Sequence, residues 1–174
     1  MPAKIILLLE DQFRDEEAVY PYYRFLEAGY EVVKVGPKKK VTYTGKFGMP
    51  MQSDMAAEDV DLEQVAAVII PGGNAPDKMR INMAMVKLVK DAFEGCKVIA
   101  AICHGGWMLV EADIIRDKKV TGYIAIATDL KNAGGQYIDR EVVVDDNIVT
   151  SRKPEDLPAF CRSTLEMIKL YFKR

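Results

Sequence analysis

Cys103 and His104 are the residues of this sequence best suited to carry a reaction. They follow the apolar run 98–102 and precede Gly105 and Gly106, so the run breaks on glycines directly after the pair. A cysteine on a sharp turn between a strand and a helix presents its sulfur above the sheet, and the helix N-terminus favours the thiolate. We therefore predict that Cys103 is a nucleophile. His104, the single histidine of the chain, is either its proton carrier or a packed structural residue.

Two further segments carry polar groups directly after apolar runs. Gly72 and Gly73 follow the run that ends at Ile70, and glycines there can turn N–H groups toward a developing oxyanion; the alternative is a plain turn. The acidic stretch 10–17, "EDQFRDEE", follows the first run. Because ligands of open α/β sheets bind beyond the carboxyl ends of the strands, these segments are expected to meet the cysteine.

The cysteine and histidine content argues against a metal or disulfide framework. Cys96 and Cys161 lack a glycine turn and are expected to be buried structural residues. Three cysteines without CxxC spacing, together with one histidine, do not supply a usual zinc ligand set. No metal and no other cofactor is expected.

The elements that must position these residues follow from the hydrophobic pattern. Four short, nearly continuous apolar runs predict strands buried on both faces, as in a parallel sheet, and helix-like segments between them give a doubly wound α/β order. Glycines close the first helices. The predicted strands are 4–9, 31–36, 66–71, 97–102 and 120–123; the helices are 15–27, 82–94, 106–113, 126–135 and 154–172; the hairpins lie in 39–53 and 141–151.

Length, charge and composition bound the function classes. The 174 residues, of which 49% are hydrophobic, fit one domain over 1–174 that can cover both faces of a sheet. A net charge of −2 does not favour nucleic acid as a partner. No apolar run approaches a membrane span, and the N-terminal run is too short and too soon acidic for a signal peptide, so a cytoplasmic protein is expected.

The sequence resembles the PfpI intracellular protease family, in the superfamily that also contains the Parkinson-disease protein deglycase and shares the class I glutamine amidotransferase-like fold. The resemblance runs nearly from end to end and is carried by residues 20–37, 45–54, 68–80, 98–123 and 129–160. It implies a flavodoxin-like three-layer α/β/α sandwich with a mainly parallel sheet and a small β-hairpin insertion. It also implies self-association into homodimers and often hexamers.

The same resemblance assigns roles to individual residues. Cys103 takes the place of the nucleophile, and His104 that of a histidine that works with an acidic side chain from a neighbouring subunit. Asp77 falls where the hexameric relatives have glutamate. The N–H groups of Gly73 and His104 correspond to the oxyanion site, and Tyr123 to a tyrosine near the pocket, beside which Gly72 also lies.

One departure concerns the carboxyl that contacts the cysteine. The family usually reads Asp/Asn-Glu-Phe-Glu-Asp after the first strand, and here Gln12 and Arg14 replace the two glutamates. Arg14 can lower a thiol pKa as a cation, but it cannot give and take a proton as a carboxyl does. Glu17 is the first substitute we consider, followed by Asp11 and Glu10; solvated acids at a helix N-terminus are the alternative.

These patterns favour a cysteine hydrolase that acts on peptide or amide bonds, or on methylglyoxal adducts in the manner of a deglycase or glyoxalase. With Arg14 in the usual glutamate position, the alternative is a stress-response, redox-sensing or chaperone member with little turnover, since an exposed thiolate oxidises readily. A glutamine amidotransferase fits less well, because those enzymes use a histidine late in the chain and this chain has His104 alone.

Overall fold

Four of the predicted apolar runs form the centre of a mainly parallel sheet in the computed structural model, which describes residues 3–172. They are β1 (Lys4–Leu8), β2 (Glu31–Gly36), β6 (Val65–Ile70) and β7 (Val98–Ile102), and β5 (Met55–Ala56), β10 (Val143–Asp145) and β11 (Ile148–Ser151) extend the sheet. The strand order is β10-β11-β7-β6-β1-β2-β5, and only β10 and β11 pair antiparallel. The predicted mixed α/β fold with a large parallel sheet is confirmed.

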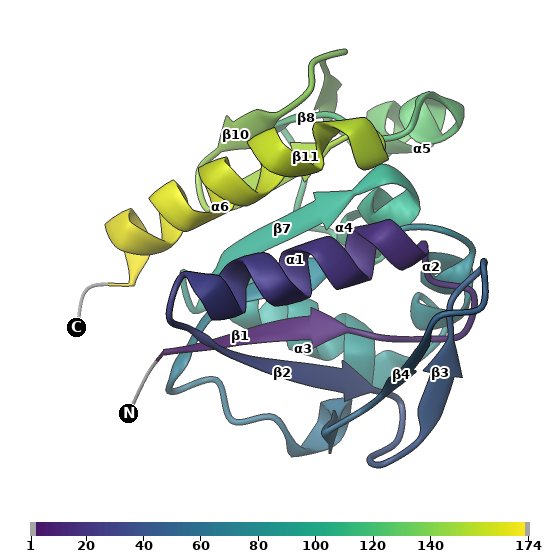
Figure 1. Ribbon diagram of the computed structural model, residues 1–174. Coiled ribbons are helices and arrows are strands. Elements are labelled where there is room, and N and C mark those ends of the chain that lie inside the picture. Colours follow the sequence, from purple (N-terminus) through teal and green to yellow (C-terminus); the bar gives the residue numbers. More distant parts are fainter. Residues whose placement is uncertain (1–2, 173–174) are drawn as a thin grey trace.

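Helices cover both faces of this sheet, which explains why its central strands are apolar throughout. In the view of Figure 1, α1 (Asp15–Glu27) and α6 (Leu157–Tyr171) lie in front of the sheet, and α3 (Met83–Glu94) and α4 (Gly106–Glu111) lie behind it. Every residue of β6 is buried as a result. No helix within residues 3–172 has the length and apolar character needed to span a membrane.

The strand order places a switch point between β1 and β6. The chain passes from β1 to β2 on one side and then returns to add β6 and β7 on the other side of β1. Loops that leave the carboxyl ends of β1 and β6 therefore diverge and leave a crevice, the usual ligand site of such sheets. The acidic loop, the glycine pair and the cysteine turn all open at this edge.

The first helix begins and ends where its residues predict. Asp15, Glu16 and Glu17 form an acidic first turn, which the positive end of the helix dipole stabilises. Gly29 follows the end of the helix with a φ of +86°, a left-handed conformation that glycine adopts without strain. The predicted bounds 15–27 of this helix are confirmed.

The small hairpin covers the loop after β1 and lies outside the main sheet. It consists of β3 (Thr42–Thr44) and β4 (Pro50–Gln52), as predicted within 39–53. The Asp15 carboxylate accepts hydrogen bonds of 2.9 Å from the N–H groups of Phe47 and Met49, so the turn is tied to the start of α1. The Lys46 N–H donates to the Phe13 carbonyl at 2.8 Å. The hairpin therefore places Lys46 beside the switch point.

Two predicted features of the chain are wrong. The strand expected at 120–123 is largely absent: β8 (Lys119–Val120) pairs with β9 (Gln136–Tyr137) in a separate small sheet, and the following residues form a loop. The Tyr123 N–H donates instead to the Cys103 carbonyl at 3.3 Å, which draws the loop to the cysteine turn. Cys161 is buried as expected, but Cys96 is exposed because it lies on the turn after α3 with a φ of +55°.

The remaining elements agree with prediction apart from their ends. The helix expected at 126–135 is α5 (Ala127–Asn132), preceded by a 3-10 turn over Ile124–Ile126. The last helix starts with a 3-10 turn over Pro154–Asp156 and continues as α6. The short helix α2 (Ala75–Met79) has no counterpart among the predicted elements, because five residues carry too little periodicity to be recognised.

Candidate active site

Cys103 sits on a strained turn at the carboxyl end of β7. Its φ is +59°, in the left-handed region that a residue with a side chain rarely occupies. A Cβ added to Gly105 would lie 2.5 Å from the Ile70 carbonyl oxygen, so only glycine lets α4 start this close to β6. Strain of this kind is kept where the surrounding structure enforces it, often at functional sites. The geometry is that of a nucleophile elbow.

The Glu17 carboxyl lies beside this elbow. Glu17 is 0% exposed, and its Oε2 accepts a 2.7 Å hydrogen bond from the Gly72 N–H. A Cβ on Gly72 would lie 2.6 Å from this Oε2 and 2.8 Å from the Cys103 Cβ, so Gly72 separates the two side chains by little more than its own backbone. Oε1 is buried without a hydrogen-bond partner among residues 3–172, and the Glu17 carboxyl and the Cys103 thiol shift each other's pKa.

Burial keeps both acids of this pair protonated near neutral pH. It raises the pKa of Glu17 to about 8, although the Gly72 N–H opposes the shift. Burial, followed by the Glu17 charge, raises the pKa of the Cys103 thiol to about 12. Burial therefore opposes the thiolate that we expect from the turn. While Glu17 keeps its proton it adds no negative charge, and it can donate a hydrogen bond to a thiolate.

Two backbone N–H groups favour the ionised form of Cys103. Those of His104 and Gly73 both lower the pKa of Cys103. Phe13 and Gly73 face each other in an isolated antiparallel bridge. The residues on either side of this pair make the hydrogen bonds of the bridge, so the bridge does not use the Gly73 N–H. A Cβ at Gly73 would lie 2.4 Å from the Gln12 carbonyl, and its φ is +76°, so this approach requires glycine.

The His104 ring faces the sulfur with one nitrogen. Its Nδ1 lies 3.3 Å from the Cys103 Sγ. The ring meets Trp107 edge to face, with centroids 5.1 Å apart, and lies 5.0 Å from the Tyr123 ring. Burial and the positive charge of Lys46 lower the pKa of His104. The imidazole is therefore neutral at pH 7 and can accept a proton from the thiol.

Asp77 does not reach His104 within one chain. It lies exposed on α2, where its N–H donates to the Asn74 carbonyl at 3.2 Å. Over residues 3–172, the His104 ring forms no ion pair with a carboxylate. The sequence-based prediction places Asp77 across a contact between subunits, and it stays a prediction.

Arg14 and the acids of the first loop form hydrogen bonds of their own, although the Cys103 charge still acts on Arg14 and, after the hydrogen bond to Glu16, helps to raise its pKa. The Arg14 side chain pairs with Glu16, with Nε 2.7 Å from Oε2, and lies 4.7 Å over the Phe47 ring. Asp11 accepts from a main-chain N–H of β3, and Glu10 from the N–H of Asp11. Among the described residues, no group of three His, Cys, Asp or Glu side chains is placed to hold a metal ion. Because the Glu17 carboxyl lies at the cysteine, the replacement of glutamate by Arg14 does not leave the pocket without a carboxyl. The expected loss of that carboxyl was the reason for the stress-response or redox-sensing alternative.

Two residues that act on His104 were missed from the sequence. Trp107 lies three residues after His104 at the start of a predicted helix, and this spacing places side chains on one face, so the signal was available. Lys46 lies in the hairpin turn, and no local pattern relates it to His104. Only the fold of the hairpin over the first loop brings it there.

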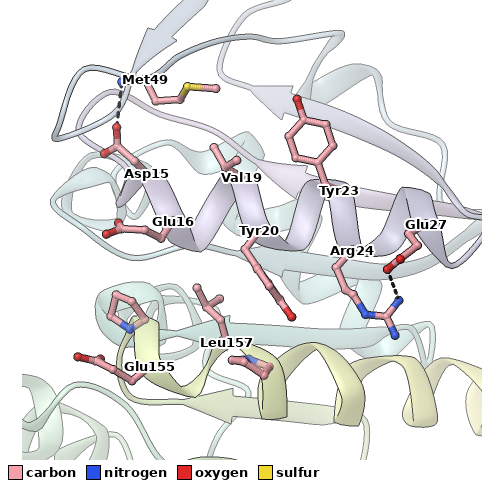
Figure 2. A pocket seen from close by; sticks show the side chains of 12 residues that line it. Asp15, Glu16, Val19, Tyr20, Tyr23, Arg24, Glu27, Met49, Glu155 and Leu157 are labelled. Atoms are coloured by element: carbon pink, nitrogen blue, oxygen red, sulfur yellow. Dashed lines mark hydrogen bonds and ion pairs between the residues drawn. The ribbon is translucent and has the colours of Figure 1, made fainter.

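A groove of about 980 Å³ lies on the outer side of α1, between α1 and α6. Figure 2 shows Tyr20 of α1 directed toward the side chains of α6, among them Leu157. Tyr20 and Tyr23 are 40% and 61% exposed. The helix α1 thus serves two surfaces: Glu17 is buried inside at the cysteine, and the tyrosines line the groove outside.

A flavodoxin-like sheet with a cysteine elbow and a buried carboxyl at its switch point defines a class of α/β proteins in which a cysteine ends a central strand. The sequence model described as the DJ-1/PfpI family matches residues 3–167. This match spans nearly the whole chain, and the chain belongs to that family, as its resemblance predicted.

Known proteins of similar sequence extend over the same residues. Deglycase PfpI of Pyrococcus furiosus is 40% identical over 166 residues, 95% of this chain and 99% of that protein. YraA of Bacillus subtilis, a proposed cysteine protease, is 43% identical over 169 residues, 97% of this chain and 100% of that protein. A crystal structure of a two-domain protein from Anabaena variabilis, with DJ-1/ThiJ/PfpI-like and ferritin-like domains, superposes with a TM-score of 0.94 at 41% identity. That alignment covers 96% of this chain and 48% of the other, so the chain spans about half of the two-domain protein.

Proposed function

We propose that this chain is a cysteine-dependent hydrolase in which the Cys103 sulfur adds to a carbonyl carbon of the substrate. The observation that carries the proposal is the set of groups around that sulfur: a neutral imidazole nitrogen at 3.3 Å, a buried carboxyl and two N–H groups. The substrates are methylglyoxal adducts of amines and thiols, or peptide and amide bonds. Relatives named as a deglycase and a proposed cysteine protease support both substrate classes.

In the proposed reaction, His104 accepts the thiol proton as the sulfur attacks. The carbonyl oxygen becomes an oxyanion, which the N–H groups of Gly73 and His104 stabilise, and losing one such donor costs on the order of 100-fold or more in rate. On a peptide or amide bond, the imidazolium then returns the proton to the leaving amine as the carbon–nitrogen bond breaks. Water releases the acyl group from the sulfur. Glu17 keeps its proton at rest and donates to the sulfur while it carries charge.

The test compares wild type, Cys103→Ser and Cys96→Ser on a methylglyoxal-modified amine and on a peptide amide. Cys96 is the matched control because its thiol is exposed and outside the site. We expect Cys103→Ser to lose at least about 1,000-fold in turnover and Cys96→Ser to stay at the wild-type rate. Equal rates for wild type and Cys103→Ser on both substrates would refute the hydrolase. The substrate that wild type turns over faster decides between deglycase and peptidase.

We also propose that the chain self-associates as a homodimer or hexamer, with Asp77 of one subunit completing His104 of the next. Two features support this: Asp77 is exposed, and the His104 ring forms no ion pair with a carboxylate over residues 3–172. The apolar groove between α1 and α6 is a surface that a second copy could cover.

A subunit-mixing experiment tests this arrangement. Cys103→Ser and Asp77→Ala are each expected to be inactive alone. When subunits are exchanged, a site can combine Cys103 from one chain with Asp77 from the other, and activity should return. Light scattering measures the assembly size in the same samples. A monomeric mass, or mixed samples that stay inactive although subunits have exchanged, would contradict the proposal.

A further inference from the structure

The carboxylate of Asp129 is tied to the active-site histidine through one intermediate ring. Asp129 lies in the first turn of α5, and its Oδ2 accepts a 2.9 Å hydrogen bond from the Trp107 Nε1–H. Trp107 in turn meets the His104 ring edge to face. We propose that Asp129 is a positioning residue that holds the His104 ring, through Trp107, in the orientation that faces Cys103. The inference rests on the proposed function, because it concerns the proton carrier of the same site.

Packing alone does not fix the indole. A hollow of about 340 Å³ adjoins it, lined by Arg80, Trp107, Val110, Asp129, Asn132 and Ala133. An aromatic side chain beside free space can change rotamer unless a specific contact holds it. The hydrogen bond to Asp129 is such a contact, and the indole N–H has a single proton to donate.

The Arg80 guanidinium contributes a second, weaker restraint. It lies 5.6 Å from the Trp107 ring centroid and is itself held by Glu111, with Nη2 3.1 Å and Nε 3.2 Å from Oε2. A cation over the face of an indole is attracted by the ring as a whole and allows the ring to slide beneath it. Direction is therefore supplied by Asp129 and not by Arg80.

The segment that carries Asp129 also carries the second ring at His104. Tyr123 precedes α5 by one 3-10 turn, and its N–H donates to the Cys103 carbonyl. Both aromatic contacts of the imidazole, at 5.1 Å to Trp107 and 5.0 Å to Tyr123, thus depend on residues 123–129. Loss of the Asp129 anchor releases one of the two rings, and the 3.3 Å approach of Nδ1 to the sulfur is then no longer enforced.

The experiment measures Cys103 reactivity and the His104 ring directly, in a Cys96→Ser background that removes the exposed thiol. Asp129→Leu removes the acceptor with little change of size, and Asp129→Asn keeps an oxygen that can accept from the indole. Asp91→Leu is the matched control, because Asp91 is an exposed carboxylate paired with Lys87 on α3. Iodoacetamide alkylation is followed between pH 6 and 9. The imidazole signals need no assignment, since the chain has one histidine.

We expect Asp129→Leu to slow alkylation at pH 7 about tenfold and to shift the His104 ring resonances, while Asp129→Asn stays within about twofold of the parent. Asp91→Leu should match the parent. If Asp129→Leu fails to fold, Trp107→Phe, which keeps a ring but has no N–H donor, should show the same slowing and shift.

Two results would overturn the inference. The first is an alkylation rate and His104 resonances that match the parent in the variants without the hydrogen bond. The second is an equal loss of alkylation rate in Asp129→Asn and Asp129→Leu. Neither readout needs a substrate. A chain that turns over neither proposed substrate can therefore still show the effect of Asp129, and the turnover test of Cys103→Ser bears on the hydrolase alone.

Discussion

Glu17→Gln should stabilise the folded protein at neutral pH. Glu17 is fully buried, and its pKa rises from the ordinary value of 4.5 to about 8 in the folded chain. As pH rises through this window the unfolded chain releases the proton and the folded chain does not, so the free energy of unfolding falls. Glutamine carries no proton to release, and its amide oxygen can still accept from the Gly72 N–H.

The size of the effect follows from the width of the window. Each pH unit in which only the unfolded chain is ionised costs the folded state about 1.4 kcal/mol. From pH 4.5 to pH 7 this amounts to roughly 3 kcal/mol, and the cost stops growing above about pH 8, where both states are ionised. A gain of that size is large against a typical domain stability of about 5–15 kcal/mol.

Urea unfolding at pH 5, 6, 7 and 8 measures the difference between Glu17→Gln and wild type. We expect the two curves to be close at pH 5 and to separate steadily up to pH 8. Glu16→Gln is the matched control on the same helical turn: Arg14 lowers the pKa of Glu16, so its removal should give no such gain. Curves for Glu17→Gln and wild type that stay parallel from pH 5 to pH 8 would refute the assignment of a buried, protonated carboxyl. The stabilised variant should also lose turnover by about tenfold or more, because an amide N–H is a weaker hydrogen-bond donor to a charged sulfur than a carboxylic acid.

Three further variants, one of them with a matched control, test the surroundings of the site. Arg14→Gln should leave alkylation of the nucleophile within about threefold of wild type, since an exposed ion pair contributes little; a loss comparable to removing a catalytic group would show that the guanidinium acts on the sulfur. Gly105→Ala should cost about 2–3 kcal/mol in urea unfolding, because the added Cβ would lie 2.5 Å from a main-chain carbonyl oxygen. Gly29→Ala is the control: an added Cβ there meets nothing within 4 Å, but the φ of +86° is unfavourable for alanine. It should cost about 1–2 kcal/mol of the free energy of unfolding, less than Gly105→Ala. Lys46→Met should raise the pKa of His104 toward its ordinary value, measured on the single imidazole signal by NMR; an unchanged pKa would remove the hairpin from the electrostatics of the site.

The parts of the fold that the sequence predicts are those with a repeated physical pattern. The four central strands are recognisable because each is apolar on both faces, and α1 because an acidic first turn and Gly29 mark its ends. Strands of two residues, such as β5, β8 and β9, have no period to detect and form only because neighbouring strands offer them an edge. The same holds for the five-residue helix α2.

Within the site, the ends of the strands bring together most of the predicted residues. Which residue of the segment 10–17 reaches the cysteine depends on the geometry of the first helical turn. Arg14 precedes the first helical residue, and its side chain stays at the helix end beside Glu16. Glu17, in the same first turn of the helix, lies on the side that faces the sheet and is buried. The family pattern aligns Arg14 with the usual glutamate and so suggests that the carboxyl is lost. The burial of the first helical turn shows that Glu17 supplies a carboxyl beside the cysteine. Trp107 and Asp129 meet through tertiary packing, and no spacing in the sequence relates them.

The resting protonation of the site makes a base necessary. Cys103 is 9% exposed, and burial raises the pKa of its thiol above the ordinary value, so the helix turn alone does not make it a thiolate. Glu17 is itself protonated at that pH and cannot take the proton. His104 is neutral and has a nitrogen 3.3 Å from the sulfur. The reactivity of Cys103 near neutrality should therefore follow the ionisation of His104, falling as pH drops through the histidine pKa, and its rate should depend on how firmly that ring is held. An alkylation rate that ignores the His104 ionisation, measured on the same sample by NMR, would show that the sulfur loses its proton by another route.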